Sequence, residues 1–178
     1  MIITDKKEII DFLTNRGADY KGRTHEVILN FSDEELEKCH DQIQWMFPLH
    51  EESKFAETYP IITLDLMAEI RANEESVLIA ERMRLAMNRM LQFYKFDEVL
   101  VDESARRTDA WPWCMNNNHN LLRITRILRS ARFFGVGDIW IDDFYRKAVE
   151  IACIRNLDMV TFKYWNKAMF DDLWESLR

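Results

Sequence analysis

Three side chains that could bind a ligand lie within residues 40–49, HDQIQWMFPL. His40 provides an imidazole, Gln44 an amide and Trp45 a large indole face that could stack on a base or a peptide side chain. The competing interpretation is structural, because a histidine on an apolar helix face is usually a satisfied core residue and tryptophan usually contributes buried area. The residue types alone leave a packed junction and the wall of a pocket both open.

A second set of polar side chains lies within residues 118–130, NHNLLRITRILRS. His119, Arg123 and Arg126 are separated by four and then three residues, so on a helix they project from one face. Two guanidinium groups on one face could hold a phosphate or carboxylate through forked hydrogen bonds. Asn120 lies near the expected start of the helix, where free backbone amides also favour anions.

Together the two stretches predict an anion or polar-ligand pocket at the point where they meet. The alternative is that the arginines pair with acids such as Glu37 or Asp41 and connect helices without forming a site. The candidate ligand-binding residues are His40, Gln44, Trp45, His119, Asn120, Arg123 and Arg126.

Metal and nucleophile chemistry have weaker support in the sequence. Cys114 and His119, with Cys39 or His40, are ligand types that suit zinc, but their spacing matches no standard zinc motif. Nucleophilic catalysis would need a cysteine or serine beside a histidine and an orienting acid, and no spacing selects such a group. The sequence also contains no phosphate-binding loop, dinucleotide turn or HExxH pair. We expect no metal or cofactor and favour a non-enzymatic domain.

Length and composition predict one soluble helical domain spanning residues 1–178. The chain has only 4 glycines and 3 prolines, which disfavours a sheet protein with many tight turns. Its formal charge of −7 disfavours nonspecific nucleic-acid binding. The 3 cysteines show no CxxC spacing and are expected to be reduced thiols. We find no signal peptide and no membrane-spanning run, so the expected location is cytoplasmic.

Helical periodicity and capping residues predict the elements that position the two stretches. A capping box of Ser32 and Glu35 begins a single helix that Pro48 ends, with His40 inside its apolar stripe. A short helix precedes it and ends at Gly17, and an ordered connection spans residues 19–30. Further helices are expected at residues 63–73, at 74–96, from the caps at 116–118 to 134, from 138 onward and from 161 onward.

Residues 97–117 break the helical pattern and predict one long irregular loop. This loop contains the basic pair Arg106 and Arg107 and the aromatic pair Trp111 and Trp113. Because long structureless segments are uncommon in compact domains and often functional, the loop is a candidate lid or specificity segment.

Three segments give the chain a resemblance to a known family. HDQIQWMFPL, a long helix ending in LQFYKF, and NHNLLRITRIL follow in the order found in the conserved domain of the opioid growth factor receptor family. The resemblance covers residues 20–145, and the chain looks like a compact microbial or viral relative. The resemblance implies binding rather than catalysis, because eukaryotic members are described as receptors for an enkephalin peptide. It supplies no catalytic residues to carry over.

The sequence therefore favours a non-enzymatic helical domain that binds a protein, a peptide or a small polar ligand. The alternative is an enzyme or sequestering protein that acts on a nucleotide-like or other anionic molecule through its arginine and histidine residues. Self-association into a homo-oligomer remains open.

Overall fold

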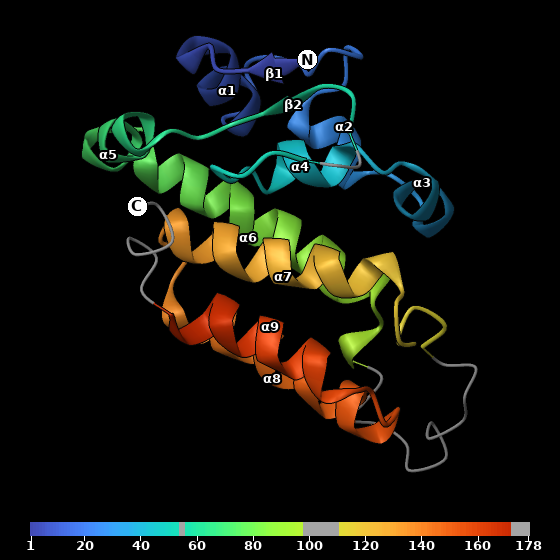
Figure 1. The fold of residues 1–178 in the computed structure, drawn as a ribbon. Coiled ribbons are helices and arrows are strands. Elements are labelled where there is room, and N and C mark those ends of the chain that lie inside the picture. Colours follow the sequence, from blue (N-terminus) through green and yellow to red (C-terminus); the bar gives the residue numbers. More distant parts are fainter. Residues whose placement is uncertain (54–55, 98–110, 172–178) are drawn as a thin grey trace.

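The computed structural model describes residues 1–53, 56–97 and 111–171, and most of the regular structure in these parts of the chain is helical (Figure 1). The all-α prediction is confirmed. The helices are α1 Lys6–Leu13, α2 His25–Leu29, α3 Asp33–Lys38, α4 Gln42–Met46, α5 Leu64–Ala72, α6 Ser76–Phe93, α7 His119–Phe133, α8 Asp138–Ile154 and α9 Met159–Phe170.

Two very short strands are the non-helical exception. Strand β1 (Ile2–Ile3) pairs in parallel with β2 (Tyr59–Pro60), so that Ile2 lies opposite Tyr59. The pairing holds the start of the chain against the segment that follows α4. The sequence analysis did not predict this pairing, because two residues are too few to show an alternating pattern.

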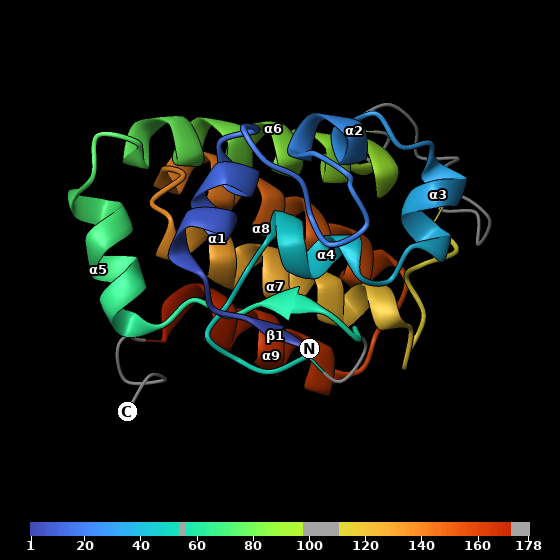
Figure 2. The ribbon, with the colours of Figure 1, turned by 90° about the horizontal axis from the view of Figure 1, so that it is seen from above.

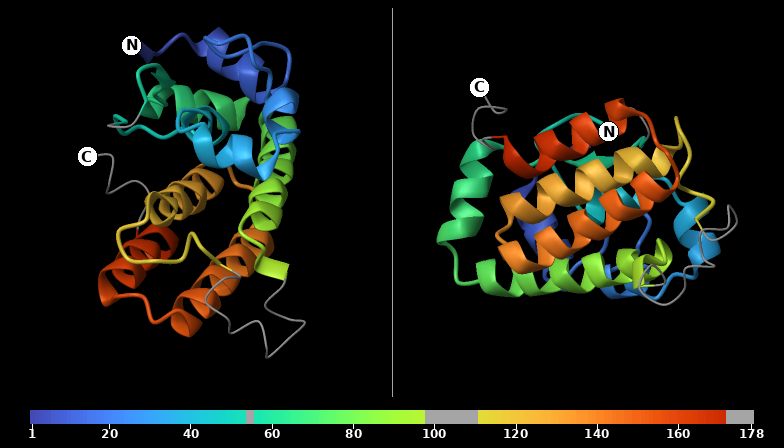
Figure 3. Two further views of the ribbon diagram at one scale, coloured as in Figure 1. Left: turned by 90° about the vertical axis from the view of Figure 1, so that its right-hand side faces the viewer. Right: turned by 90° about the horizontal axis from the view of Figure 1, so that it is seen from below.

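Helix α7 occupies the middle of the fold. It packs against α6, α8 and α9, and its remaining side meets the chain segment that contains α3 and α4. Figure 2, the view from above, shows α4 lying across α7, and Figure 3 shows α8 and α9 side by side beneath it. The inward stripe of α7 is apolar and completely buried at Ile124, Ile127 and Leu128. This position explains how α7 can supply both core residues and the polar face of a site.

The end of the predicted loop is built into the core. Trp111 and Trp113 are buried, and their indole nitrogens donate to the backbone oxygens of Lys95 (3.3 Å) and Tyr94 (3.1 Å), respectively. Trp113 also meets the Tyr94 ring edge-on, with the ring centroids 5.0 Å apart. These two tryptophans therefore anchor the chain as it enters α7. The rest of the predicted loop, residues 98–110 with the basic pair, lies outside the described residues.

The prediction of one helix from Ser32 to Pro48 is wrong. The capping box of Ser32 is present, but α3 ends at Lys38, and Cys39 has extended backbone angles of φ −88° and ψ 97°. A new helix, α4, begins at Gln42. His40 therefore lies in the connection between the helices and is exposed, instead of facing the core in an apolar stripe. Side chains from distant parts of the chain stabilise this break, as the next section shows.

Several further boundaries differ from the predictions: α1 ends at Leu13 and not at Gly17, and α6 is shorter at both ends than the predicted helix at 74–96. The segment at residues 19–30 contains a short helix, α2, in which Thr24 accepts from the amide of Val27. Five residues are too few to show a helical period in the sequence. Helix α9 begins two residues before Thr161, because the side chain of Asp158 accepts from the Thr161 amide and caps the helix.

Other helix ends lie where the capping residues placed them. Thr63 caps α5 by accepting from the amide of Leu66, and Asn118 caps α7 by accepting from the amide of Asn120. Within the described residues, no helix combines the length and apolarity that crossing a membrane requires.

Candidate functional site: a cleft beside helix α7

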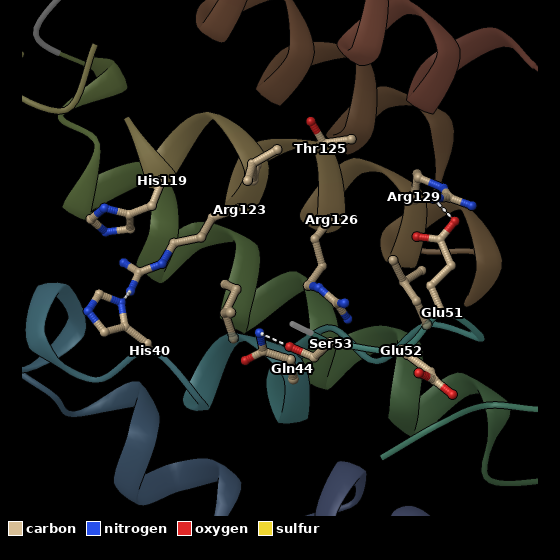
Figure 4. Close-up of a pocket in the computed structure, with 13 residues that line it drawn as sticks. His40, Gln44, Glu51, Glu52, Ser53, His119, Arg123, Thr125, Arg126 and Arg129 are labelled. Atoms are coloured by element: carbon tan, nitrogen blue, oxygen red, sulfur yellow. Dashed lines mark hydrogen bonds and ion pairs between the residues drawn. The ribbon is translucent and has the colours of Figure 1, made fainter. Parts of the chain in front are cut away.

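A cleft of about 440 Å³ lies between α7 and the chain segment 40–53. Figure 4 shows its polar side chains approaching one another from these two parts of the chain. The two stretches singled out in the sequence therefore meet in space. The lining residues are His40, Ile43, Gln44, Leu49, Glu51, Glu52, Ser53, His119, Leu122, Arg123, Thr125, Arg126 and Arg129.

Arg123 holds the end of α3 against α7. Its side chain is only 5% exposed, and Nη1 donates to the backbone oxygen of Leu36 at 3.1 Å. Nη2 approaches the backbone oxygens of Glu37 and Cys39, both at 3.4 Å. These carbonyls have no helical partner because α3 ends here, so the guanidinium satisfies them instead. Most of its donors are thus already used within the protein.

Two histidines form one end of the cleft. Arg123 Nη2 lies 3.2 Å from Nδ1 of His40, and a guanidinium can only donate, so Nδ1 accepts and the neutral ring carries its proton on Nε2. The His40 and His119 rings meet edge to face, with centroids 5.1 Å apart. Burial, together with the neighbouring charge of Arg123, lowers the pKa of His119. His119 is therefore neutral at pH 7 and adds no charge to the cleft.

Arg126 differs from its neighbours because the part of the chain that the structure describes gives it no acidic partner. Its Nη1 donates to the backbone oxygen of Phe47 at 3.2 Å. No carboxylate of the described residues lies within ion-pair distance of its guanidinium. Burial lowers the pKa of Arg126 to about 10, and the group remains charged at neutral pH. The cleft therefore contains a partly buried positive charge whose donors are not all used by residues 1–53, 56–97 and 111–171.

The flanking arginines are neutralised within the protein. Arg129 Nη1 lies 2.5 Å from Oε1 of Glu51, and Arg123 Nη1 lies 3.7 Å from Oε2 of Glu37. The sequence alternative in which arginines pair with acids is thus correct for Arg123 and Glu37. It is wrong for Asp41, which pairs with two cations before α3, Lys21 and Arg23.

Gln44 fixes the floor of the cleft. With its amide nitrogen turned toward the backbone, it donates to the carbonyl oxygens of His40 (2.8 Å) and Asp41 (3.1 Å). In this orientation its amide oxygen accepts from Ser53 Oγ at 3.1 Å. Gln44 thereby connects the break between α3 and α4 to the segment that forms the outer rim.

Two of the seven candidate residues do not line the cleft. Trp45 is completely buried and packs edge-on against Phe12, with ring centroids 5.1 Å apart, so its indole serves the core and offers no stacking face. Asn120 is also fully buried, and its amide nitrogen donates to the Glu37 carboxylate at 3.1 Å. It therefore supports the Arg123 contacts from behind.

Sequence reasoning missed part of the lining. Arg129 follows Arg126 by three residues and continues the same helix face, so the spacing contained a usable signal. The sequence analysis gives no role to Glu51, Glu52 and Ser53, because nothing in their local pattern shows that this stretch folds over α7. The apolar wall formed by Ile43, Leu49 and Leu122 was likewise not predicted.

Cys39 and Cys114 are poor nucleophiles in this setting. Burial raises the pKa of Cys114 to about 12, and burial together with a hydrogen bond to Asp41 raises the pKa of Cys39. Both thiols are therefore protonated at neutral pH, whereas nucleophilic cysteines act as thiolates. The cleft itself offers a charged donor, hydrogen-bonding groups and an apolar wall, which is an arrangement suited to binding.

The fold and the cleft together define a helical domain with a preformed cationic recess. The profile described as "Opioid growth factor receptor (OGFr) conserved region" matches residues 16–149. The chain therefore belongs to the opioid growth factor receptor conserved-region family, as its sequence indicated. No solved structure gives a significant match.

Among curated proteins, the chain is similar to the opioid growth factor receptor-like protein 1 of Mus musculus, with 33% identity over 108 residues, covering 57% of this chain and 22% of the relative. It is 33% identical over 118 residues to the opioid growth factor receptor of Rattus norvegicus, covering 62% and 20%. The receptor-like protein 1 of Xenopus tropicalis is 30% identical over 142 residues, covering 74% and 26%. The chain thus spans about a fifth to a quarter of these relatives.

Proposed function

We propose that this chain is a non-enzymatic binding domain that takes an acidic group of a protein or peptide partner into the cleft, with Arg126 as the anchor. Relatives of this chain are named receptors, which supports a binding role. The observation that carries the proposal is the partly buried guanidinium of Arg126, which has no carboxylate within ion-pair distance among the described residues. A carboxylate on the partner would supply the missing counter-ion through a forked pair of hydrogen bonds.

The wall of the cleft favours a peptide segment over a bare ion. Ile43, Leu49 and Leu122 provide apolar surface beside Arg126, and Leu122 is 53% exposed, so it has surface left to bury. An acidic residue with an apolar neighbour would use both features. Because Gln44 and Arg123 are fixed by internal hydrogen bonds, the recess would need little ordering on binding.

The second candidate function is binding of a small anionic molecule, such as a nucleotide. The cleft volume of 440 Å³ supports it, since small-molecule sites are typically about 300–1,000 Å³. The His40 imidazole offers a donor at Nε2 near the recess. This alternative shares Arg126 as its anchor and differs from the first in the size and apolar content of the ligand.

The test is a thermal-stability screen of the full chain against blocked pentapeptides that contain one aspartate or glutamate beside a leucine, with nucleotides as a parallel panel. Ligands that raise the melting temperature are then titrated calorimetrically. We expect an acidic peptide to bind the wild type, and Arg126→Gln to weaken this binding by about 10- to 100-fold, the value of one charge-assisted hydrogen-bond pair.

Two variants serve as controls. Arg129→Gln removes a nearby arginine that already pairs with Glu51, so it should reduce peptide affinity less than threefold. Arg126→Lys keeps the charge but loses the paired N–H donors of the guanidinium. Its peptide affinity should lie between those of the wild type and Arg126→Gln. Equal binding by wild type and Arg126→Gln, or stabilisation by nucleotides and by no peptide, would contradict the peptide proposal.

A further inference from the structure

Helices α8 and α9 form a surface on the side of α7 away from the cleft (Figure 3). They lie side by side, since the Tyr145 and Phe170 rings meet with centroids 5.7 Å apart. Their inner faces are fully buried at Phe144, Ala148 and Trp165. Their outer faces therefore point away from the core and are unpartnered in the described chain.

This outer surface exposes large apolar side chains to an unusual degree. Ile139 on α8 is 84% exposed, and Met159 and Phe170 on α9 are 76% and 68% exposed. Val160 is 59% exposed. Single exposed apolar residues are normal, but several on two adjacent helices commonly mark an interaction surface.

The charges on the two helices are opposite and arranged in rows. On α8, Asp142 and Glu150 share the exposed face of Ile139, and neither forms an ion pair with residues 1–53, 56–97 or 111–171. On α9, Lys163 is likewise unpaired within the described ranges, and Lys167 lies 3.9 Å from Asp171, both of them more than half exposed. Arg146 lies between these two acids on α8 but pairs with Asp143 at 2.7 Å, so the charges that the described residues leave unpaired are acidic on α8 and basic on α9.

We infer that this surface, the outer faces of α8 and α9, is the interface of a homodimer. A twofold axis running between the helices and parallel to them places α8 of each copy over α9 of the other. The acidic row then faces the basic row twice, and the exposed apolar residues are covered. No other partner is needed to explain both features, because the surface is complementary to itself.

The positions of the acids along α8 and of the lysines along α9 agree with this arrangement. Tyr145 hydrogen-bonds to Asn166, which sets the level at which the antiparallel helices meet. Counting outward from that contact, Glu150 is five residues away and Lys163 three, and Asp142 is three residues away and Lys167 one, so each acid lies within two residues, or about 3 Å, of the level of a lysine. A twofold axis along the helices preserves these levels, so each acid meets a base of the second copy.

The footprint predicts a weak dimer. Helix α8 has 17 residues and is therefore about 25 Å long, and two helices are about 20 Å wide. The area that the two outer helix faces can bury is therefore at the small end of the range for stable interfaces, which typically bury about 1,200–2,000 Å² in total. We expect a dissociation constant in the micromolar range, and the cleft beside α7 stays open in both copies.

Sedimentation velocity of the full chain over a concentration series tests the proposal. The wild type should shift from monomer to dimer with increasing concentration. The double variants Lys163→Glu with Lys167→Glu, and Asp142→Lys with Glu150→Lys, should each remain monomeric, because like charges then face each other. Mixing the two variants should restore a dimer, since all rows become complementary again.

Circular dichroism checks that each variant is folded, and Val77→Asp, at an exposed apolar site on α6, should dimerise like the wild type. A wild type that stays monomeric throughout the series would overturn the inference. So would variants that dimerise as well as the wild type, or a mixture that stays monomeric.

Discussion

Arg123 donates to Nδ1 of His40 at 3.2 Å, across 83 residues of sequence. The same guanidinium donates to the backbone of Leu36 and contacts the Asn120 amide oxygen at 3.1 Å. Arg123 therefore fixes the break between α3 and α4 and the orientation of the His40 ring at once. This leaves Arg126, one helical turn further along, as the cation available to a ligand.

Arg123→Met should lower the free energy of unfolding by about 3 kcal/mol, because the buried carbonyls at the end of α3 lose their donors. Urea denaturation at pH 7 measures this loss. Arg82→Met is the matched control: Arg82 pairs with Glu26 at the surface, and its loss should cost about 0.5 kcal/mol. A cost for Arg123→Met below about 1 kcal/mol would show that these contacts do not stabilise the break.

Asp41→Asn should destabilise the protein mainly at neutral pH. Burial would raise the pKa of Asp41, but hydrogen bonds from Lys21, Tyr20, Cys39 and Arg23 outweigh it and hold the pKa well below 3.8. A lowered pKa means that the carboxylate contributes its stability above pH 3.8 and loses it as the pH falls below that value. The difference between wild type and variant should be about 2 kcal/mol at pH 7 and should shrink below pH 4.

Urea titrations of both proteins at pH 7, 5 and 3 measure this difference. The prediction fails if the gap between the two proteins is the same at pH 3 and pH 7.

His25→Leu should make the protein less sensitive to mild acid. His25 is fully buried, neither ring nitrogen has a hydrogen-bond partner among the described residues, and burial lowers its pKa to about 4. The unfolded chain binds a proton near pH 6.5 and the folded chain does not, so wild-type stability falls as the pH drops from 6.5 to 4. The loss from this group is about 3 kcal/mol over that range.

The His25→Leu variant lacks this loss and buries no unpaired nitrogen, so its stability at pH 7 should stay within about 1 kcal/mol of the wild type. Its relative stability should increase as the pH approaches 4. Thermal unfolding between pH 7 and pH 4 measures both values, and parallel pH profiles for the two proteins would contradict the prediction.

Trp165 anchors α9 to α7. Its ring is completely buried, and Nε1 donates to the backbone oxygen of Leu121 at 3.1 Å. Trp165→Phe loses mainly this bond and should cost about 1 kcal/mol. Trp165→Ala also leaves a cavity and should cost about 3–5 kcal/mol, as measured by chemical denaturation. Similar costs for the two variants would show that the hydrogen bond, and not the packing, holds α9 in place.

The helix ends that sequence reasoning placed correctly depend on neighbouring residues. Thr63 and Asn118 each accept from an amide two or three residues ahead, so their effect can be predicted from a few adjacent positions. The common face of His119, Arg123 and Arg126 follows from helix geometry alone. For the same reason Arg129 could have been added to this face from its spacing.

The errors concern contacts between distant residues. Residues 32–47 carry an apolar stripe that suits one helix, yet the chain breaks at Cys39 because Arg123 and Arg23 bind groups exposed by the break. The break also turns α4, which sends Trp45 into the core and leaves His40 at the cleft. No local pattern contains this information.

By itself, the sequence determined the helical class, the family and the two stretches that form the cleft, because periodicity, capping and residue type act over a few neighbouring positions. The tertiary structure decided which polar groups already form hydrogen bonds or ion pairs within the protein. Arg123 and Arg126 look alike in sequence, but only packing shows that Arg123 meets backbone oxygens and that Arg126 lacks a carboxylate among the described residues. Pairing of charges depends on through-space distances, and those are fixed only when the helices pack.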